Sequence, residues 1–177
     1  MEQARPATAA DVPRLTELAR ELRDELATYR GGGLWRTRDV EGEPLDAKLE
    51  ALLDRRDAAV IVGTIDDVPV GYGVVVIEPL RDGSCIGVIS ELFVEPDARS
   101  VGVGEAIASA IVDDCRVAGC TGVDVVALPG HRATKNFFEE QGFTARAITM
   151  HHQIGEATDE ESDAPDDVVA EADGGAG

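Results

Sequence analysis

The segment 91–105 constrains the fold of this chain more than any other part of the sequence. An apolar run ends at Val94, Pro96 stops the strand that this run predicts, and a helix is expected to begin around Gly102 and Gly104. Glycines at a helix start let successive backbone N–H groups face outward without a Cβ in the way. These N–H groups have no partner within the helix and lie at the positive end of its dipole, so they predict a site for phosphate groups.

Apolar periodicity and breaking residues divide the rest of the chain into helices and strands. Two tight turns, at 66–67 and at 81–84, join three consecutive apolar runs, which is typical of an antiparallel meander. The glycines at 31–33 end the first helix, and a loop is expected from there to Arg38. The predicted elements are a strand over 3–8, a helix from an Asp11 N-cap to about Arg30, a helix over 45–54, strands over 58–65, 70–78 and 85–94, a helix over 102–118, a strand over 123–128, a helix over 131–141 and a strand over 144–154. This β-α-α-β-β-β-α-β-α-β order predicts an α/β fold with a mixed sheet covered by helices.

The charge of the chain is unevenly distributed. The 177 residues carry a formal net charge of −19, and a chain of this length is expected to form one domain. Residues 155–177 hold nine acidic residues and no Lys or Arg, which leaves −10 on residues 1–154. We therefore predict a folded domain over 1–154 and an acidic, disordered tail over 155–177. An acidic body disfavours nucleic acid and anionic membrane surfaces as partners, because both need a basic face.

The N-terminus, cysteines and histidines bear on the location and chemistry of the protein. No apolar run approaches the ~20 residues that span a bilayer, and the N-terminus lacks the apolar segment of a signal peptide. Cys85, Cys115 and Cys120 are odd in number and form no C-x-x-C pair, which fits reduced thiols in a cytoplasmic protein. His151 and His152 would face opposite sides of a strand, so no metal site is predicted.

Three other readings of the glycine-rich helix start can be compared. A dinucleotide-binding G-x-G-x-x-G would need a small residue at Ile107, and its glycines should follow the strand directly, whereas seven residues separate Val94 from Gly102. A phosphate loop would need Gly-Lys-Ser/Thr, which is absent. A helix start with convenient glycines would explain Gly102 and Gly104 alone, but not the longer pattern that contains them.

The longer pattern, Val94-x-Pro96-x-x-Arg99-x-x-Gly102-x-Gly104, resembles the acetyl-CoA signature of the GNAT N-acetyltransferase superfamily. The run 136–143, Asn-Phe-Phe-Glu-Glu-Gln-Gly-Phe, resembles the next motif of that family, in which Gly-Phe closes a helix. The order of elements over 3–154 also matches the family fold. With two motifs in the correct order, the chain is identified as a member of this superfamily.

The resemblance implies a site for acetyl-CoA, used as a co-substrate without a metal. The end of the fourth strand would pair its backbone with the pantetheine arm, and a backbone N–H there would polarise the thioester carbonyl. Amides from Ser100 to Glu105 would hold the pyrophosphate, and His131 would approach the far side of the pantetheine. The residues implied to bind acetyl-CoA are Leu92, Phe93, Val94, Arg99, Ser100, Val101, Gly102, Val103, Gly104, Glu105, His131 and Phe138.

The sequence departs from the family pattern at three places. His131 stands where Asn is common, Phe138 stands where Tyr is common, and Ser100-Val101 replaces a pair that is often more basic or contains glycine. The Tyr is the usual candidate for protonating the departing coenzyme A, so Phe138 removes a general acid. Because a thiol has a pKa of ~8.5, a thiolate can leave at neutral pH without that help.

Preparation of the amine is the harder step of the implied reaction. An alkylamine with a pKa of ~10.4 is neutral in only about one molecule per few thousand at pH 7, so a base would raise the reactive fraction. Glu91 is the leading candidate, because alternation along the strand puts Glu91 and Phe93 on one face and Leu92 and Val94 on the other. A purely structural role for Glu91, bound to backbone or to an arginine, explains its position equally well.

Weaker candidates for the base and the lining of the acceptor site complete the set of functional residues. Tyr72 and Glu78 are alternative bases on the neighbouring strand, and Tyr72 is also a candidate contact for the acceptor. His131 titrates near neutrality, but a helix cap and cofactor contact is the simpler interpretation of it. In this family the link between the first two helices often lines the acceptor site. Here that link carries Tyr29 and Trp35, which could stack on an amine or merely fill the edge of the core.

The residues are compatible with two classes of function. The first is an enzyme in which a primary amine of a small molecule or peptide attacks acetyl-CoA directly in a ternary complex. The second is a non-catalytic module that senses acyl-CoA or contacts a protein. This alternative stays open because Phe138 replaces the usual general acid and the general base is not established. Whether the protein forms a homodimer is also left open.

Overall fold

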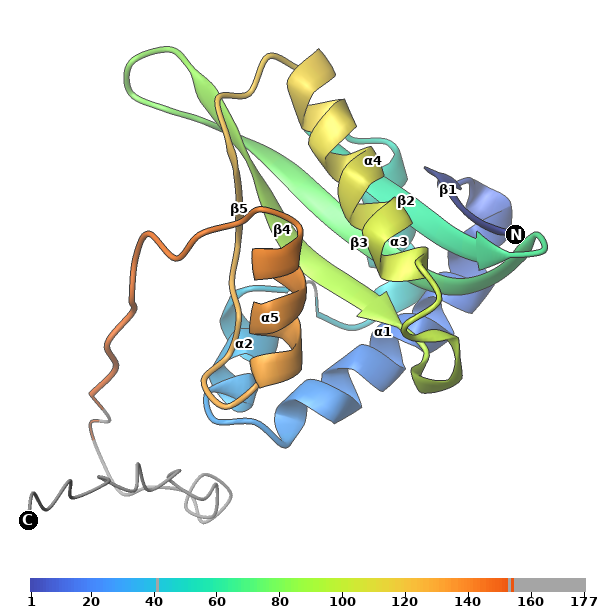
Figure 1. Cartoon of the computed structure of the whole chain (residues 1–177), viewed down its shortest axis with the longest axis horizontal. Coiled ribbons are helices and arrows are strands. Elements are labelled where there is room, and N and C mark those ends of the chain that lie inside the picture. Colours follow the sequence, from blue (N-terminus) through green and yellow to red (C-terminus); the bar gives the residue numbers. More distant parts are fainter. Residues whose placement is uncertain (41, 153, 155–177) are drawn as a thin grey trace, which may run out of the picture.

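The computed structural model describes residues 1–40, 42–152 and 154 of the chain. One mixed sheet organises it, with five strands in the order β1-β2-β3-β4-β5 (Figure 1). The strands are β1 (Glu2–Pro6), β2 (Ala58–Ile65), β3 (Val68–Pro79), β4 (Cys85–Val94) and β5 (Val123–Val125). Neighbours from β1 to β4 are antiparallel, whereas β5 runs parallel to β4 over only Gly87–Ile89. The predicted meander and mixed sheet are therefore confirmed.

Helices cover both faces of this sheet (Figure 1). The helices are α1 (Val12–Ala27), α2 (Gly32–Arg38), α3 (Leu45–Leu53), α4 (Val103–Val117) and α5 (Arg132–Glu140), with short 3-10 turns at Ala9–Asp11 and Pro96–Ala98. Leucines of α1 and α3 and Trp35 of α2 pack with Val62, Val74 and Phe93 on one face of the sheet. Apolar residues of α4 and α5 pack with Ile61, Val75 and Val94 on the other face. The chain thus forms a three-layer α/β arrangement, as its apolar spacing predicts.

Helix α4 packs directly over glycines of the sheet. A Cβ added to Gly63 of β2 would lie 2.6 Å from side-chain atoms of Val103 and Ile107. A Cβ added to Gly73 of β3 would lie 2.8 Å from Ile107 and from Ile111. Real Cβ atoms do not approach other heavy atoms this closely, so the glycines allow this packing. They bring the first turn of α4 down beside the end of β4.

Asp11 connects β1 to the start of α1. It precedes α1, as predicted, but its carboxylate does not bond the helix amides. It accepts hydrogen bonds from the Thr8 N–H and hydroxyl, and two from the Arg5 guanidinium at 2.8 and 2.7 Å. The Arg5 hydrogen bonds, with those from Thr8, outweigh burial and hold the pKa of Asp11 far below its usual range.

We expect Asp11→Asn to lower the free energy of unfolding by about 1–2 kcal/mol at pH 7, because the Arg5 side chain is 44% exposed and solvent screens the pair. The depressed pKa of Asp11 means that its contribution is present above pH ~4 and is lost as the pH falls from there toward the folded-state pKa. Urea unfolding of both proteins at pH 7 and near pH 3 should therefore show a difference that shrinks in acid. Asp97→Asn, at an exposed carboxylate, is the control; an equal effect of both changes would contradict this role of Asp11.

Three predicted segments differ from the structure. The loop expected after the first helix contains α2, which begins after Gly31 in a left-handed conformation and buries Trp35 against the core. The strand expected over 123–128 ends at Val125, because the chain turns away from β4 there and Leu128 packs toward the α1 side. No strand forms over 144–152, where Ile148 and Met150 are 85% and 87% exposed, since no neighbouring backbone pairs with this segment in the described part of the chain.

Two further observations concern the described residues alone. None of the helices that the structure describes is both long and apolar enough to cross a membrane. Within the same residues, no group of three or more His, Cys, Asp or Glu side chains is placed to hold a metal ion. The acidic tail predicted over 155–177 lies outside the described residues.

Candidate active site

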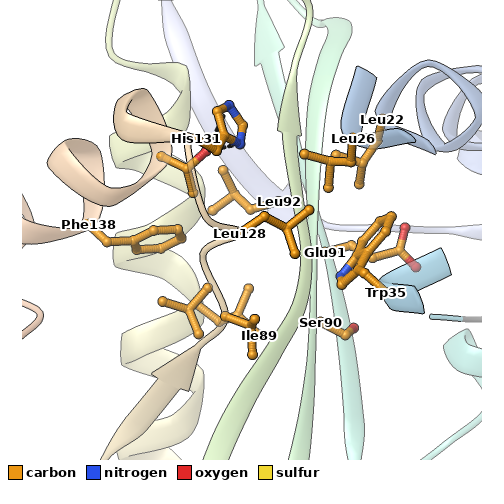
Figure 2. A pocket seen from close by; sticks show the side chains of 13 residues that line it. Leu22, Leu26, Trp35, Ile89, Ser90, Glu91, Leu92, Leu128, His131 and Phe138 are labelled. Carbon is orange, nitrogen blue, oxygen red and sulfur yellow. Dashed lines mark hydrogen bonds between the residues drawn. The ribbon is translucent and has the colours of Figure 1, made fainter. Parts of the chain in front are cut away.

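A cleft opens where β4 and β5 separate. The two strands pair only from Gly87 to Ile89 on β4, and beyond that point β5 leaves the sheet while β4 continues to Val94. The space at this opening, counted together with the open solvent in front of it, is about 440 Å³. Figure 2 shows His131 and Phe138 of α5 on one side of β4, with Leu22 and Leu26 of α1 and Trp35 on the other. The wall is mostly apolar, which suits the uncharged arm of a ligand more than a charged group.

The backbone of β4 offers hydrogen-bonding groups to this cleft. The Glu95 N–H bonds the Val70 carbonyl of β3 at 2.9 Å, and Tyr72 lies opposite Phe93 in the register. Because successive residues of a strand point their N–H groups to opposite sides, those of Leu92 and Val94 point toward the β5 side. No β5 residue pairs with β4 beyond Ile89 among the described residues. The Leu92 and Val94 N–H groups are therefore in place for an extended chain laid beside β4.

A register shift sets the faces of β4. Val74 pairs with Glu91 and Val75 pairs with Ile89, so Ser90 is the extra residue. After this bulge the phase is the one expected from the sequence. Glu91 and Phe93 face α1, where Phe93 joins that core, and Val94 packs on the α4 side. The bulge thus turns the Glu91 side chain toward α1 at the level of the cleft.

The start of α4 lies directly beyond the end of β4. Gly102 adopts a left-handed φ of +97° as the N-cap, and the Ala106 N–H is bonded to its carbonyl at 3.0 Å. The amides of Val103, Gly104 and Glu105 precede that bond and lie outside the hydrogen bonding of the helix. A Cβ on Gly104 would lie 3.2 Å from the Phe137 ring of α5 and 3.8 Å from Val94. These unbonded amides therefore lie in the first turn of α4, close to β4 and α5, and a helix start of this kind suits an anion.

Arg99 is held beside the end of β4. Its Nε donates to the Val94 carbonyl at 2.9 Å, and its Nη2 donates to Glu25 of α1 at 2.6 Å. The guanidinium also lies 5.5 Å from the centre of the Phe93 ring. The positive charge predicted for the phosphate site is thus paired with Glu25 in this structure. The backbone amides of α4 are the groups left for an anion.

Glu91, the leading candidate base, lies in a buried network. Its side chain is 3% exposed, and its carboxylate accepts hydrogen bonds from Arg23 of α1 at 3.1 and 3.3 Å. The Tyr72 hydroxyl also donates to Glu91. Burial, with the nearby carboxylate, raises the pKa of Tyr72 well above its usual value, so Tyr72 stays protonated as the donor. The carboxylate lines the cleft, but both of its oxygens already accept hydrogen bonds.

His131 closes the other side of the cleft at the start of α5. Its ring stacks on Tyr29 with centroids 4.3 Å apart, and Thr134 Oγ1 lies 2.9 Å from its Nδ1. Its Nε2 is 3.8 Å from a Glu25 oxygen. Burial lowers the pKa of His131, with Arg99 acting in the same direction and Glu25 opposing. Its neutral imidazole is therefore favoured at neutral pH.

The remaining predicted residues divide into two groups. Trp35 and Phe138 line the cleft, although they are only 5% and 4% exposed. Tyr72 is 0% exposed and does not line the cleft, so its contact with the acceptor stays a prediction. Glu78 is exposed at the far end of β3, opposite Ile86, and is not brought to Glu91.

Sequence reasoning missed two residues that organise the site, Arg23 and Glu25. Arg23 follows Leu15 and Ala19 at a spacing of four, so a charged residue lies on the apolar stripe of α1. That placement signals a buried partner, but it does not identify Glu91, which lies 68 positions away. Glu25 carries no sequence signal, because its partners Arg99 and His131 come from distant elements.

Comparisons with known proteins identify the family and the fold. The acetyltransferase (GNAT) family model matches residues 19–143. A putative acetyltransferase from Agrobacterium tumefaciens is 20% identical with a TM-score of 0.67, covering 86% of this chain and 99% of its own. Glucosamine-6-phosphate N-acetyltransferase from Arabidopsis thaliana is 21% identical with a TM-score of 0.64, covering 88% and 99%. AAC(6')-Iy, solved with a bisubstrate analogue of coenzyme A and acetylneamine, is 19% identical with a TM-score of 0.66, covering 87% and 99%. No curated protein matches the sequence of this chain.

The fold and the cleft therefore define an acetyltransferase architecture. The chain belongs to the GNAT acetyltransferase family, whose members use acetyl-CoA as the acetyl donor. At identities near 20%, the solved structures establish the fold and leave the acceptor of this chain open.

Proposed function

We propose that this protein transfers an acetyl group from acetyl-CoA to a primary amine of a small molecule or peptide. The observation that carries the proposal is an apolar cleft beside β4, followed along the chain by a helix start with unbonded amides. The cleft wall reaches Leu92 on β4, and after Val94 ends the strand, the turn at Pro96–Ala98 leads to the unbonded amides of α4. The wall would hold the pantetheine arm, and the amides of 103–105 would hold the pyrophosphate.

The acidic composition does not oppose this ligand. Nine of the nineteen net negative charges lie in 155–177, outside the described residues. The remaining charges are screened over ~8–10 Å in physiological salt. A helix N-terminus acts at hydrogen-bond range, so its local field at the phosphates outweighs distant surface carboxylates.

The reaction is a direct displacement in a ternary complex. The amine nitrogen attacks the thioester carbonyl carbon, the carbon–sulfur bond breaks, and coenzyme A leaves as a thiolate. A backbone N–H of Leu92 or Val94 would stabilise the negative charge on the carbonyl oxygen in the transition state. No covalent enzyme intermediate is needed, and none of the cysteines lines the cleft among the described residues.

Among the described residues, the titratable side chains that line the cleft and could receive the amine proton are those of Glu91 and His131. We propose that Glu91 accepts the amine proton, directly or through a water molecule, and that Arg23 and Tyr72 hold its carboxylate in position.

The pH dependence of kcat/KM distinguishes Glu91 from His131 as the base, because the acid limb of the profile reports the base of the free enzyme. Glu91→Gln should lower kcat and alter that limb. His131→Asn, which installs the residue common in the family, should leave the limb unchanged; the opposite result would move the role to His131.

A thiol-release assay with acetyl-CoA tests the proposed activity. Small amines, polyamines and peptides with free N-termini serve as separate acceptor sets, and acetyl-CoA binding is measured in parallel by calorimetry. Acceptor-dependent release of coenzyme A supports the enzyme. Tight binding of acetyl-CoA without turnover on any acceptor would instead favour the non-catalytic sensor.

Tyr29 and Trp35 are proposed to contact the acceptor, since they lie beside His131 and on the α1–α2 side of the cleft. One solved neighbour, an aminoglycoside acetyltransferase from an uncultured soil metagenomic sample, holds sisomicin and is 16% identical to this chain. A cationic amine would suit an aromatic wall and an acidic body. The proposed acceptors are therefore primary amines.

We expect Phe138→Tyr to change kcat by less than about threefold at pH 8, because a thiol of pKa ~8.5 leaves without protonation. Phe138 is 4% exposed and packs edge-on against Phe137 and Phe143, so the melting temperature of the variant must be checked as well. An increase of tenfold or more in an equally stable variant would show that this enzyme lacks a proton donor it needs.

A further inference from the structure

Two half-buried thiols meet where the loop between α4 and β5 passes the first residue of β4. Cys85 begins β4, and Cys120 lies in that loop. Their Sγ atoms are 3.1 Å apart across 35 positions of sequence. A disulfide bond would need this separation to shorten to ~2.05 Å.

Backbone hydrogen bonds hold the two thiols against each other. The Thr121 N–H donates to the Cys85 carbonyl at 2.8 Å, and the Gly87 N–H donates to the Gly122 carbonyl at 3.0 Å. The Cys120 N–H donates to the Cys115 carbonyl at 2.9 Å, which ties the loop to the end of α4. The pair is therefore pre-arranged by the fold rather than brought together by chance motion of a free loop.

The third cysteine occupies a different environment. Cys115 is 2% exposed in the core beneath α4, and a Cβ on Gly87 would collide with its Sγ. Burial raises the pKa of the Cys115 thiol. Cys115 therefore serves as the internal control for the other two, since it is close in space but enclosed by packing.

We propose that Cys85 and Cys120 are a modification site, forming a reversible disulfide when a hydroperoxide oxidises the protein. One of the two sulfurs attacks the peroxide oxygen, forming a sulfenic acid and releasing water or an alcohol. The other sulfur then displaces the hydroxyl group, which leaves as water with the thiol proton. Two electrons pass from the sulfurs to the peroxide, and a thiol reductant restores both cysteines.

Burial, reinforced by the neighbouring thiols, raises the pKa of Cys120, which lowers the fraction of its reactive thiolate. The reaction needs only one thiolate of the pair, because the other sulfur then resolves the sulfenic acid.

The bond would lie at the closed end of the cleft. Cys85 and Cys120 directly precede the short ladder of Gly87–Ile89 with Val123–Val125, beyond which the strands separate. A disulfide there would fasten β5 to β4 and close a long loop of the unfolded chain. We expect oxidation to raise the melting temperature by on the order of 5 °C.

The test compares the reduced full-length protein with the same protein treated with hydrogen peroxide. Intact mass should fall by the two hydrogens lost, and non-reducing peptide mapping should show a Cys85–Cys120 link. Cys85→Ser and Cys120→Ser should abolish the link, whereas Cys115→Ala should keep it. The melting temperatures of the reduced variants confirm that each is folded.

A Cys85–Cys120 link in the wild type and in Cys115→Ala, with a raised melting temperature that dithiothreitol reverses, supports the proposal. A Cys115–Cys120 link overturns it. The proposal is also overturned if all three thiols still react with a thiol reagent after peroxide treatment, or if every disulfide formed joins two chains. A Cys85–Cys120 link with an unchanged or lowered melting temperature also overturns it, because the bond would then form only in a distorted state.

Discussion

Arg23→Met is expected to lower the free energy of unfolding by about 3–5 kcal/mol, because it leaves the Glu91 carboxylate buried without its ion-pair partner. The two side chains are 6% and 3% exposed and share two hydrogen bonds. Methionine keeps most of the volume of the arginine stem, so the change removes charge more than packing. Urea unfolding at pH 7 measures the difference.

A double-mutant cycle separates the pair from the rest of the fold. In a Glu91→Gln background, Arg23→Met should cost much less, since a neutral amide is easier to bury than a carboxylate. Arg20→Met, at an exposed position one turn earlier on α1, should stay within about 0.5 kcal/mol of the wild type. A loss below about 1 kcal/mol for Arg23→Met would show that Glu91 is well solvated, which would strengthen its case as a base reached by water.

Gly104→Glu is expected to weaken acetyl-CoA binding by at least about 100-fold. The new carboxylate would lie among the amides proposed to hold the pyrophosphate, and like charges placed together cost several kcal/mol. The structure adds a second effect, because a Cβ here already presses on Phe137 and so disturbs the contact between α4 and α5. Calorimetric titration with acetyl-CoA at two salt concentrations measures the loss.

Gly104→Gln is the matched control, since it adds the same bulk and the same contact with Phe137 but no charge. Gly104→Gln should bind acetyl-CoA at least about tenfold more tightly than Gly104→Glu. This difference in affinity should become smaller at higher salt, which screens the repulsion between the new carboxylate and the phosphates. Equal affinities for the two variants at low salt would place the phosphates elsewhere. Melting temperatures of both variants show whether each retains the fold.

Much of the fold could be predicted from local patterns. The strands from Ala58 to Val94 and helix α4 lie within a few residues of their predicted bounds, because β-branched runs and tight turns leave few alternatives. The alternation that puts Glu91 and Phe93 on one face also holds in the structure. Patterns failed where an element depends on its neighbours. Helix α2 needed the core that buries Trp35, and the segment 144–152, predicted as part of a strand, has no paired backbone among the described residues.

The candidate site was only partly predictable for the same reason. The glycines at the start of α4 indicate exposed amides by their own conformation, and the family motif places them after β4. The pairing of Glu91 with Arg23 joins residues 68 positions apart, and the pairing of Arg99 with Glu25 joins residues 74 positions apart. No local pattern encodes the distance between such residues.

The sequence by itself determined the meander, the glycine-lined start of α4 and the family, because each follows from steric and hydrogen-bonding rules that act within a few residues. Only the tertiary structure decided where β5 leaves β4, and hence where the cleft opens. It also decided that Glu91 is held by Arg23 and Tyr72, and that Cys85 meets Cys120. These features depend on how whole elements pack, since a cleft and a buried ion pair exist only where surfaces from distant segments come together.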